Sequence, residues 1–186
     1  MKPDKESIYT QLLVVRSQRG DREALGQLIQ LWQQRLFYYI RRLVETEEDA
    51  WDVLQECWFK LHRDLLKLRQ PTCFAAWIYR IARNTAMSHL RSEFAKSGIN
   101  EGKENPSLDD GNCGGCQLEE AQRVHYGLCK LSLPHREVLT LHFLEDLSIK
   151  EIAEVVGVPP GTVKSRLFHA KRLLREILEK EDKRHG

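Results

Sequence analysis

The stretch that most constrains this chain lies near its carboxyl end, at residues 148–175. Ser148 and Glu151 have the spacing of a capping box, in which each side chain satisfies a backbone N–H, so we expect a helix to begin at Ser148. Gly157 follows the apolar positions of this helix and suits a tight turn. Pro160 then suits the first position of a second helix. Two helices joined by a tight turn are typical of a DNA-binding helix-turn-helix.

The second helix of this pair presents basic and hydroxyl side chains, and no acidic residue occurs between positions 160 and 175. Such side chains bind phosphates and base edges in the major groove of duplex DNA. A solvated amphipathic helix has a similar composition, but the capping box, the glycine turn and the acid-free face occur together, which favours DNA binding. The candidate duplex-binding residues are Thr162, Lys164, Ser165, Arg166, His169 and Arg172.

Length and composition allow one large or two small domains, because 41% of the 186 residues are hydrophobic and can form real cores. The net charge is only +2, so a nucleic-acid site must be local. No apolar run reaches membrane-spanning length and the first residues lack a signal-peptide core, so we expect a cytoplasmic protein. The five cysteines show no disulfide-framework spacing and are expected to be reduced.

Apolar residues recur at helical spacing along most of the chain, which predicts an all-α fold. The predicted helices cover residues 8–15, 25–43, 45–61, 74–91, 118–131, 135–144, 148–156 and 160–177. This periodicity disappears between 95 and 117, where five of the eleven glycines lie, so that segment is predicted to be a flexible linker. We therefore expect two helical domains, at 8–94 and 118–180, with the helix-turn-helix at the end of the second.

The most acidic stretch runs from Glu45 to Glu56 and contains six acidic residues and no basic one. It opens a predicted helix on which Trp51 and Leu54 are expected to face inward. Carboxylates in the first turns of a helix favour its dipole, and that effect alone could explain the run. The alternative is a surface for a basic partner. The candidate partner-binding residues are Asp49, Asp52, Gln55 and Glu56.

The predicted helix at 74–91 is rich in aromatic and basic residues and has no acidic one. Single-stranded nucleic acid is bound by such a surface, because bases stack on aromatic rings while arginines hold phosphates. Trp77 fits a core position equally well, and both roles are compatible. The candidate single-strand-binding residues are Trp77, Arg80, Arg83 and Asn84.

The predicted linker contains one close cysteine pair, Cys113 and Cys116. A C-x-x-C pair can form half of a zinc site or a redox centre, but a zinc knuckle needs a second pair nearby and the local sequence has none. We therefore favour an incidental pair and expect no metal and no cofactor.

Four stretches, in order, resemble the extracytoplasmic-function (ECF) sigma factors of bacterial RNA polymerase. Residues 49–56 look like the family's core-polymerase-binding helix, and residues 74–84 look like its promoter-melting and minus-ten-reading helix. Residues 133–138 are similar to the opening of its C-terminal domain, and residues 161–167 to its minus-thirty-five-reading helix. The sequence departs from the family at Trp51 and Ser88, which are often acidic there, and at His169, which is often Arg.

This resemblance implies a transcription initiation factor that binds core RNA polymerase, directs it to promoters and helps to melt the minus-ten region. Its expected partners are core polymerase, duplex and single-stranded promoter DNA, and an anti-sigma factor of the kind such proteins often have. No catalysis is expected, since no catalytic motif is present. The alternatives are a stand-alone helix-turn-helix regulator and a redox- or metal-responsive DNA-binding protein. The acidic helix at residues 45–61 favours the initiation factor over the stand-alone regulator, because a stand-alone regulator does not need a polymerase-binding surface.

Overall fold

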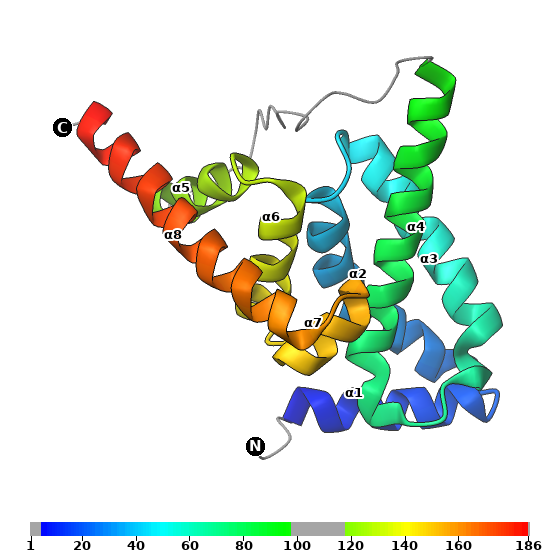
Figure 1. Cartoon of the computed structure of the whole chain (residues 1–186). Coiled ribbons are helices and arrows are strands. Elements are labelled where there is room, and N and C mark those ends of the chain that lie inside the picture. Colours follow the sequence, from blue (N-terminus) through cyan, green and yellow to red (C-terminus); the bar gives the residue numbers. More distant parts are fainter. Residues whose placement is uncertain (1–4, 98–117, 186) are drawn as a thin grey trace. The chain divides into compact units, whose positions relative to one another are not determined.

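A computed structural model of the protein describes residues 5–97 and 118–185 (Figure 1). Every regular element within these ranges is a helix, which confirms the predicted all-α fold. None of the helices in these ranges combines the length and the apolar character that crossing a membrane requires. The predicted linker lies outside the described residues except for 95–97, and so do both cysteines of the C-x-x-C pair.

The chain divides into two compact units, and the first comprises the residues up to 98 together with Glu154–Gly157. This N-terminal unit contains α1 (Lys5–Gln18), α2 (Arg22–Arg41), α3 (Glu47–Asp64), the short 3₁₀ turns η1 (Leu65–Lys67) and η2 (Pro71–Cys73), and α4 (Phe74–Ser97). Consecutive helices pack on one another, α1 on α2, α2 on α3 and α3 on α4. The two helices that carry the acidic and the aromatic-basic candidate residues, α3 and α4, are therefore direct neighbours.

Side-chain caps explain where two of these helices begin. Asp21 is the N-cap of α2, because its side chain accepts a hydrogen bond from the Ala24 backbone N–H at 3.0 Å. This bond, with the side-chain bond from Arg16, lowers the pKa of Asp21. At α3 the cap is Thr46, whose hydroxyl accepts from the Asp49 backbone N–H at 3.0 Å while the Asp49 carboxylate bonds back. The acidic run was noted at the start of this helix, but the Thr46–Asp49 capping box was not predicted.

An aromatic cluster forms the centre of the N-terminal unit. The Trp32 ring lies edge-on to Phe74 and Tyr79, with centroids 5.3 and 5.8 Å apart, and Tyr39 lies 5.1 Å from Tyr79. All four side chains are at most 4% exposed. Edge-to-face pairs add to the free energy of burial, so this cluster holds α2 against α4 and sets which face of α4 stays in solvent.

The second unit holds the helices that follow, except for Glu154–Gly157, the last turn of α7 and the glycine after it, which belong to the first unit. Its elements are α5 (Leu118–Cys129), α6 (Leu133–Leu139), the π-helical turn η3 (Thr140–Leu144), α7 (Ile149–Val156) and α8 (Pro160–His185). The sequence predicted one regular helix over 135–144, and the structure instead changes to π-helical winding at Thr140. Both α5 and α6 pack against α8.

A buried arginine joins α6 to the end of α5. Arg136 is 3% exposed, and its guanidinium donates hydrogen bonds of 2.9 to 3.0 Å to the carbonyls of Leu128, Cys129 and Leu131. Carbonyls at a helix end lack intrahelical partners, so one planar cation satisfies three of them here. No role was predicted for Arg136 from the sequence.

Gly127 allows α5 to approach α8 closely. A Cβ at this position would lie 2.6 Å from Leu174 Cδ1 and 3.2 Å from Leu178 Cδ2, whereas a Cβ at Gly26 on α2 would meet nothing within 4 Å. We expect Gly127→Leu to lower the free energy of unfolding of the C-terminal unit by about 1–3 kcal/mol, because overpacking forces side chains and backbone apart. Thermal unfolding would measure this, with Gly26→Leu as the control. Equal stability of both variants would contradict close packing at Gly127.

Candidate functional site

The structure contains the predicted helix-turn-helix. Ser148 N–H donates to Glu151 Oε2 at 2.8 Å and Glu151 N–H donates to Ser148 Oγ at 3.3 Å, which confirms the capping box before α7. Gly157 has a φ of 73°, a value that side chains other than glycine rarely allow. α8 begins at Pro160, as expected for a proline in the first helical turn.

The two sides of α8 differ in burial and chemistry. Val163, Leu167 and Ala170 are at most 5% exposed and belong to the core of the C-terminal unit. The six candidate duplex-binding residues lie on the first four turns of the same helix. Among them Lys164, Ser165, His169 and Arg172 are exposed and Thr162 and Arg166 are half-buried. The structure therefore brings the whole predicted set onto one helix.

An exposed aromatic side chain interrupts this polar surface. Phe168 is 67% exposed, although the neighbouring Leu167 is buried. Close by, Lys171 Nζ lies 4.7 Å from the centroid of the Phe143 ring, and Phe143 is also exposed. Phe168 was not predicted as a site residue, although its position outside the apolar stripe of this helix indicates that it does not belong to the core.

On α4 the candidate residues form an outward face. Arg80 and Asn84 are exposed and Trp77 and Arg83 are half-buried. Positions 77, 80 and 84 share one face because they are spaced by three and four. Trp77 also packs beside Phe74, with ring centroids 6.0 Å apart. The indole thus lies at the edge of the core with part of its surface in solvent, a position that fits both of the roles considered for it.

On α3 three of the four candidate residues share an exposed surface, which we call the α3 surface: Asp52, Gln55 and Glu56. The Glu56 carboxylate is 2.7 Å from Lys60 Nζ. Asp49 is placed differently, because its carboxylate bonds to Thr46 and lies 2.9 Å from His89 Nε2 on α4.

The environment of Asp49 keeps its carboxylate ionised. Burial would raise the pKa of Asp49, but hydrogen bonds from Thr46 and His89 outweigh it and leave the pKa below its ordinary value. The Asp49 side chain therefore caps α3 and links α3 to α4, while the α3 surface faces outward.

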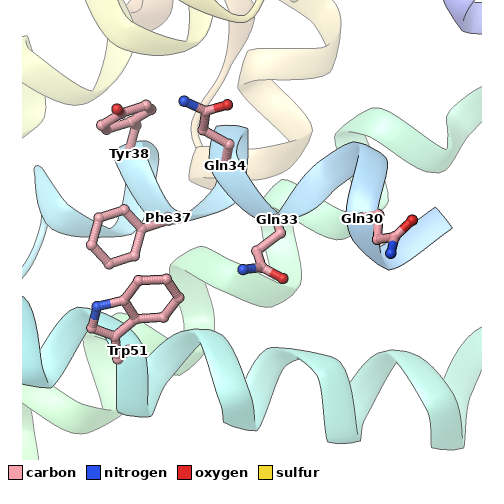
Figure 2. A pocket seen from close by; sticks show the side chains of 6 residues that line it. All are labelled: Gln30, Gln33, Gln34, Phe37, Tyr38 and Trp51. Atoms are coloured by element: carbon pink, nitrogen blue, oxygen red, sulfur yellow. The ribbon is translucent and has the colours of Figure 1, made fainter. Parts of the chain in front are cut away.

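A groove of about 420 Å³ lies between α2 and α3, beside the α3 surface (Figure 2). Its lining residues are Gln30, Gln33, Gln34, Phe37, Tyr38 and Trp51. Figure 2 shows Phe37 and Trp51 facing each other, with ring centroids 4.3 Å apart. Trp51 is 45% exposed, so the expectation that it faces inward was wrong. Its ring packs on the Phe37 ring of α2 instead of entering the core.

Within the described residues, no group of three or more His, Cys, Asp or Glu side chains could hold a metal ion. Cys57 is fully buried between α3 and α4, and burial raises the pKa of its thiol to about 12. A protonated, inaccessible thiol is neither a metal ligand nor a nucleophile, so Cys57 acts as a small hydrophobic core residue.

Comparison with known proteins agrees with this geometry. The family model for Sigma-70 region 2 matches residues 28–94, and that for Sigma-70 region 4 matches residues 121–174. The chain is 33% identical to the RNA polymerase sigma-H factor of Pseudomonas aeruginosa, over 91% of this chain and 93% of that protein. It is 31% identical to the ECF RNA polymerase sigma-E factor of Haemophilus influenzae, over 94% and 97%. The chain belongs to the ECF sigma factors.

Two solved structures share the fold of this sigma factor. One is CnrH in complex with the cytosolic domain of CnrY, with a TM-score of 0.67, 24% identity, and coverage of 92% of this chain and 98% of that chain. The other is the sigma factor RpoE in complex with the anti-sigma factor NepR from Bartonella quintana, with a TM-score of 0.67, 23% identity, and coverage of 83% and 96%.

Family membership confirms the predicted function: this sigma factor acts with core RNA polymerase and directs it to promoter DNA. The region 2 match covers most of α2, all of α3 and nearly all of α4, and the region 4 match runs from α5 through α6 and α7 into the first half of α8. The family identity by itself favours a binding protein over an enzyme.

Proposed function

We propose that this sigma factor uses three separate surfaces in initiation and catalyses no covalent step. The α3 surface binds core polymerase, the outward face of α4 binds and helps to melt the minus-ten region, and α8 reads the minus-thirty-five duplex. The proposed domains are residues 8–94 and 118–180, and the proposed place of action is the cytoplasm.

The α3 surface combines charge with aromatic groups. Exposed carboxylates such as Asp52 steer and orient the encounter with a basic partner surface and contribute less to the affinity itself. The groove beside them offers Trp51 and Tyr38, which are 45% and 46% exposed, and residues of these types dominate the binding energy of protein interfaces. We therefore extend the polymerase-binding surface from the predicted carboxylates to this groove.

The α4 face suits unpaired bases. Extruding a base from duplex DNA costs a few kcal/mol, and stacking on an aromatic ring returns about 1–3 kcal/mol. Trp77 offers such a ring, Arg80 a phosphate ligand, and Asn84 an amide that can hydrogen-bond a base edge. Melting and recognition can then occur as one event.

The observation that carries the proposal is the direct link between α3 and α4. Lys60 Nζ on α3 lies 3.0 Å from Thr85 Oγ1 on α4, and Asp49 Oδ1 lies 2.9 Å from His89 Nε2. These contacts join the two helices at two points, 11 residues apart on α3 and four residues apart on α4. Polymerase bound to the α3 surface would therefore hold the α4 face in a fixed orientation toward the DNA.

The test is co-purification of the full chain with core RNA polymerase, followed by mapping of transcript starts. We expect stoichiometric association and starts that share two spaced sequence boxes. If the protein binds promoters tightly without polymerase, and changes no transcript start when polymerase is present, it is instead a stand-alone regulator. An anti-sigma factor is the further partner we propose, because the similar RpoE chain was solved in complex with one.

A further inference from the structure

A second helix contributes a titratable group beside the proposed minus-thirty-five surface. His135 lies in the first turn of α6, which packs against α8. Its Nδ1 lies 3.0 Å from Ser132 Oγ, while its Nε2 makes no hydrogen bond within the part of the chain that the structure describes. One ring nitrogen is thus oriented by the protein and the other is available to a ligand.

The charges of α8 act directly on this imidazole. Burial lowers the pKa of His135, and the nearby charges of His169 and Arg166 lower it further. The three side chains therefore form a cationic cluster drawn from two helices. When His135 is protonated, the protein without DNA holds its charge beside that of Arg166, and an anion placed between them would remove that repulsion.

Among the described residues, the other groups near His135 are buried or engaged elsewhere. On its own helix Arg136 and Glu137 are buried, and the Arg136 guanidinium is bonded to α5 carbonyls. On η3, His142 Nδ1 lies 3.1 Å from the Leu147 carbonyl oxygen. After α5, Lys130 lies over the Tyr126 ring. No carboxylate within the described residues forms an ion pair with Arg166 or His169, whereas Arg172 and Arg175, further along α8, each lie 3.7 Å from a glutamate.

We propose that His135 joins Arg166 and His169 in binding one phosphate of promoter DNA, so that DNA binding takes up protons and strengthens as the pH falls. The proposal rests on the proposed role of α8 as the duplex-reading helix. It adds α6 to the DNA-contacting surface of this protein and makes a histidine, rather than a permanent cation, one of the phosphate ligands.

The direction of the pH dependence follows from the cluster. Without DNA the pKa of His135 is lowered, so the imidazole is neutral at pH 8. A phosphate raises that pKa, so the contact is formed at low pH and lost as the pH rises through the value in the complex. Each proton taken up changes the affinity by at most about tenfold per pH unit. Histidines titrate between about pH 5 and 8, which defines the window to measure.

Fluorescence anisotropy with the full chain and a short mixed-sequence DNA duplex tests this at constant ionic strength. We expect wild-type affinity to rise steadily from about pH 8 to about pH 5.5. His135→Asn, which keeps a polar partner for Ser132 but cannot protonate, is expected to reduce this slope. His135→Arg supplies a permanent cation and is expected to bind at pH 8 as tightly as the wild type at low pH. Circular dichroism verifies that both variants fold.

His62→Asn is the matched control, because His62 is an exposed histidine on α3 in the other unit. If His135→Asn keeps the full wild-type slope, as His62→Asn should, the phosphate contact is refuted. If His135→Arg binds the duplex no more tightly at pH 8 than His135→Asn does, the phosphate contact of His135 is also refuted. If Lys164→Ala leaves duplex binding unchanged, the proposed role of α8 fails, and the present inference fails with it.

Discussion

Asp52→Lys is expected to weaken holoenzyme assembly at least tenfold, which corresponds to about 1.4 kcal/mol. Asp52 is exposed on α3, so its substitution leaves the core untouched. Reversing its charge replaces attraction to a basic polymerase surface by repulsion, and like charges across an interface are costly. Titration of core RNA polymerase with labelled protein would measure the change.

The double variant Asp52→Lys with Glu56→Lys is expected to abolish assembly. The second change has an additional effect, because Glu56 lies 2.7 Å from Lys60, which itself bonds to Thr85 on α4. A lysine at position 56 would repel Lys60 and so weaken the bond between Lys60 and Thr85. The single variant is therefore the cleaner test of the interface, and the double variant also tests the coupling of α3 to α4.

Glu23→Lys is the control for both variants, since Glu23 is an exposed acid of the same unit on α2. It changes the net charge by the same amount as Asp52→Lys, away from the α3 surface. Wild-type affinity in the Asp52→Lys variant, or an equal loss in Glu23→Lys, would show that the α3 surface is not the polymerase contact. Helicity measured by circular dichroism separates lost binding from lost folding.

Substitutions on α4 and on α8, the two helices that we propose to contact DNA, are expected to impair different steps. Lys164 and Arg166 lie in the first turns of α8, where side chains reach base edges and phosphates of a duplex. Lys164→Ala and Arg166→Ala are expected to weaken binding to double-stranded promoter DNA, by about 1–3 kcal/mol where a base edge is read. Each lost phosphate contact reduces the salt slope by roughly one unit. Strand opening, once the DNA is bound, should survive.

Asn84→Ala is expected to leave duplex binding intact and to impair opening. Asn84 is exposed on α4 in the same face as Trp77, a setting suited to an unstacked base. Permanganate footprinting of the holoenzyme on linear and pre-melted templates would measure this. A pre-melted bubble should restore part of the signal but not the base preference. Ser92→Ala, an exposed substitution about two turns further along α4, is the control.

An Asn84→Ala variant that opens linear promoter as well as the wild type, with unchanged base preference, would remove α4 from the minus-ten role. The opposite pattern is equally informative for α8. If the Lys164 and Arg166 variants bind duplex normally but fail to open it, the assignments of the two helices are exchanged.

Features that depend on residues close in the chain could be predicted from the sequence. The Ser148 and Glu151 capping box, the turn at Gly157 and the start of α8 at Pro160 all involve residues at most four positions apart. Local hydrogen bonds and backbone preferences decide such features, and few other arrangements compete with them. Apolar periodicity likewise predicted the helices and their inward faces, with errors mainly at their ends.

Features that depend on residues distant in the chain were decided only by the tertiary structure. Asp49 and His89 are separated by 40 positions, and only the packing of α3 on α4 turns that carboxylate away from the α3 surface. Trp51 was expected to face inward until its contact with Phe37 was known. The phosphate contact proposed for His135 depends on the packing of α6 against α8, which the sequence does not show. Periodicity shows which side of a helix is apolar. For side chains between the apolar and the polar side, the neighbouring helix determines whether they are buried, paired or exposed.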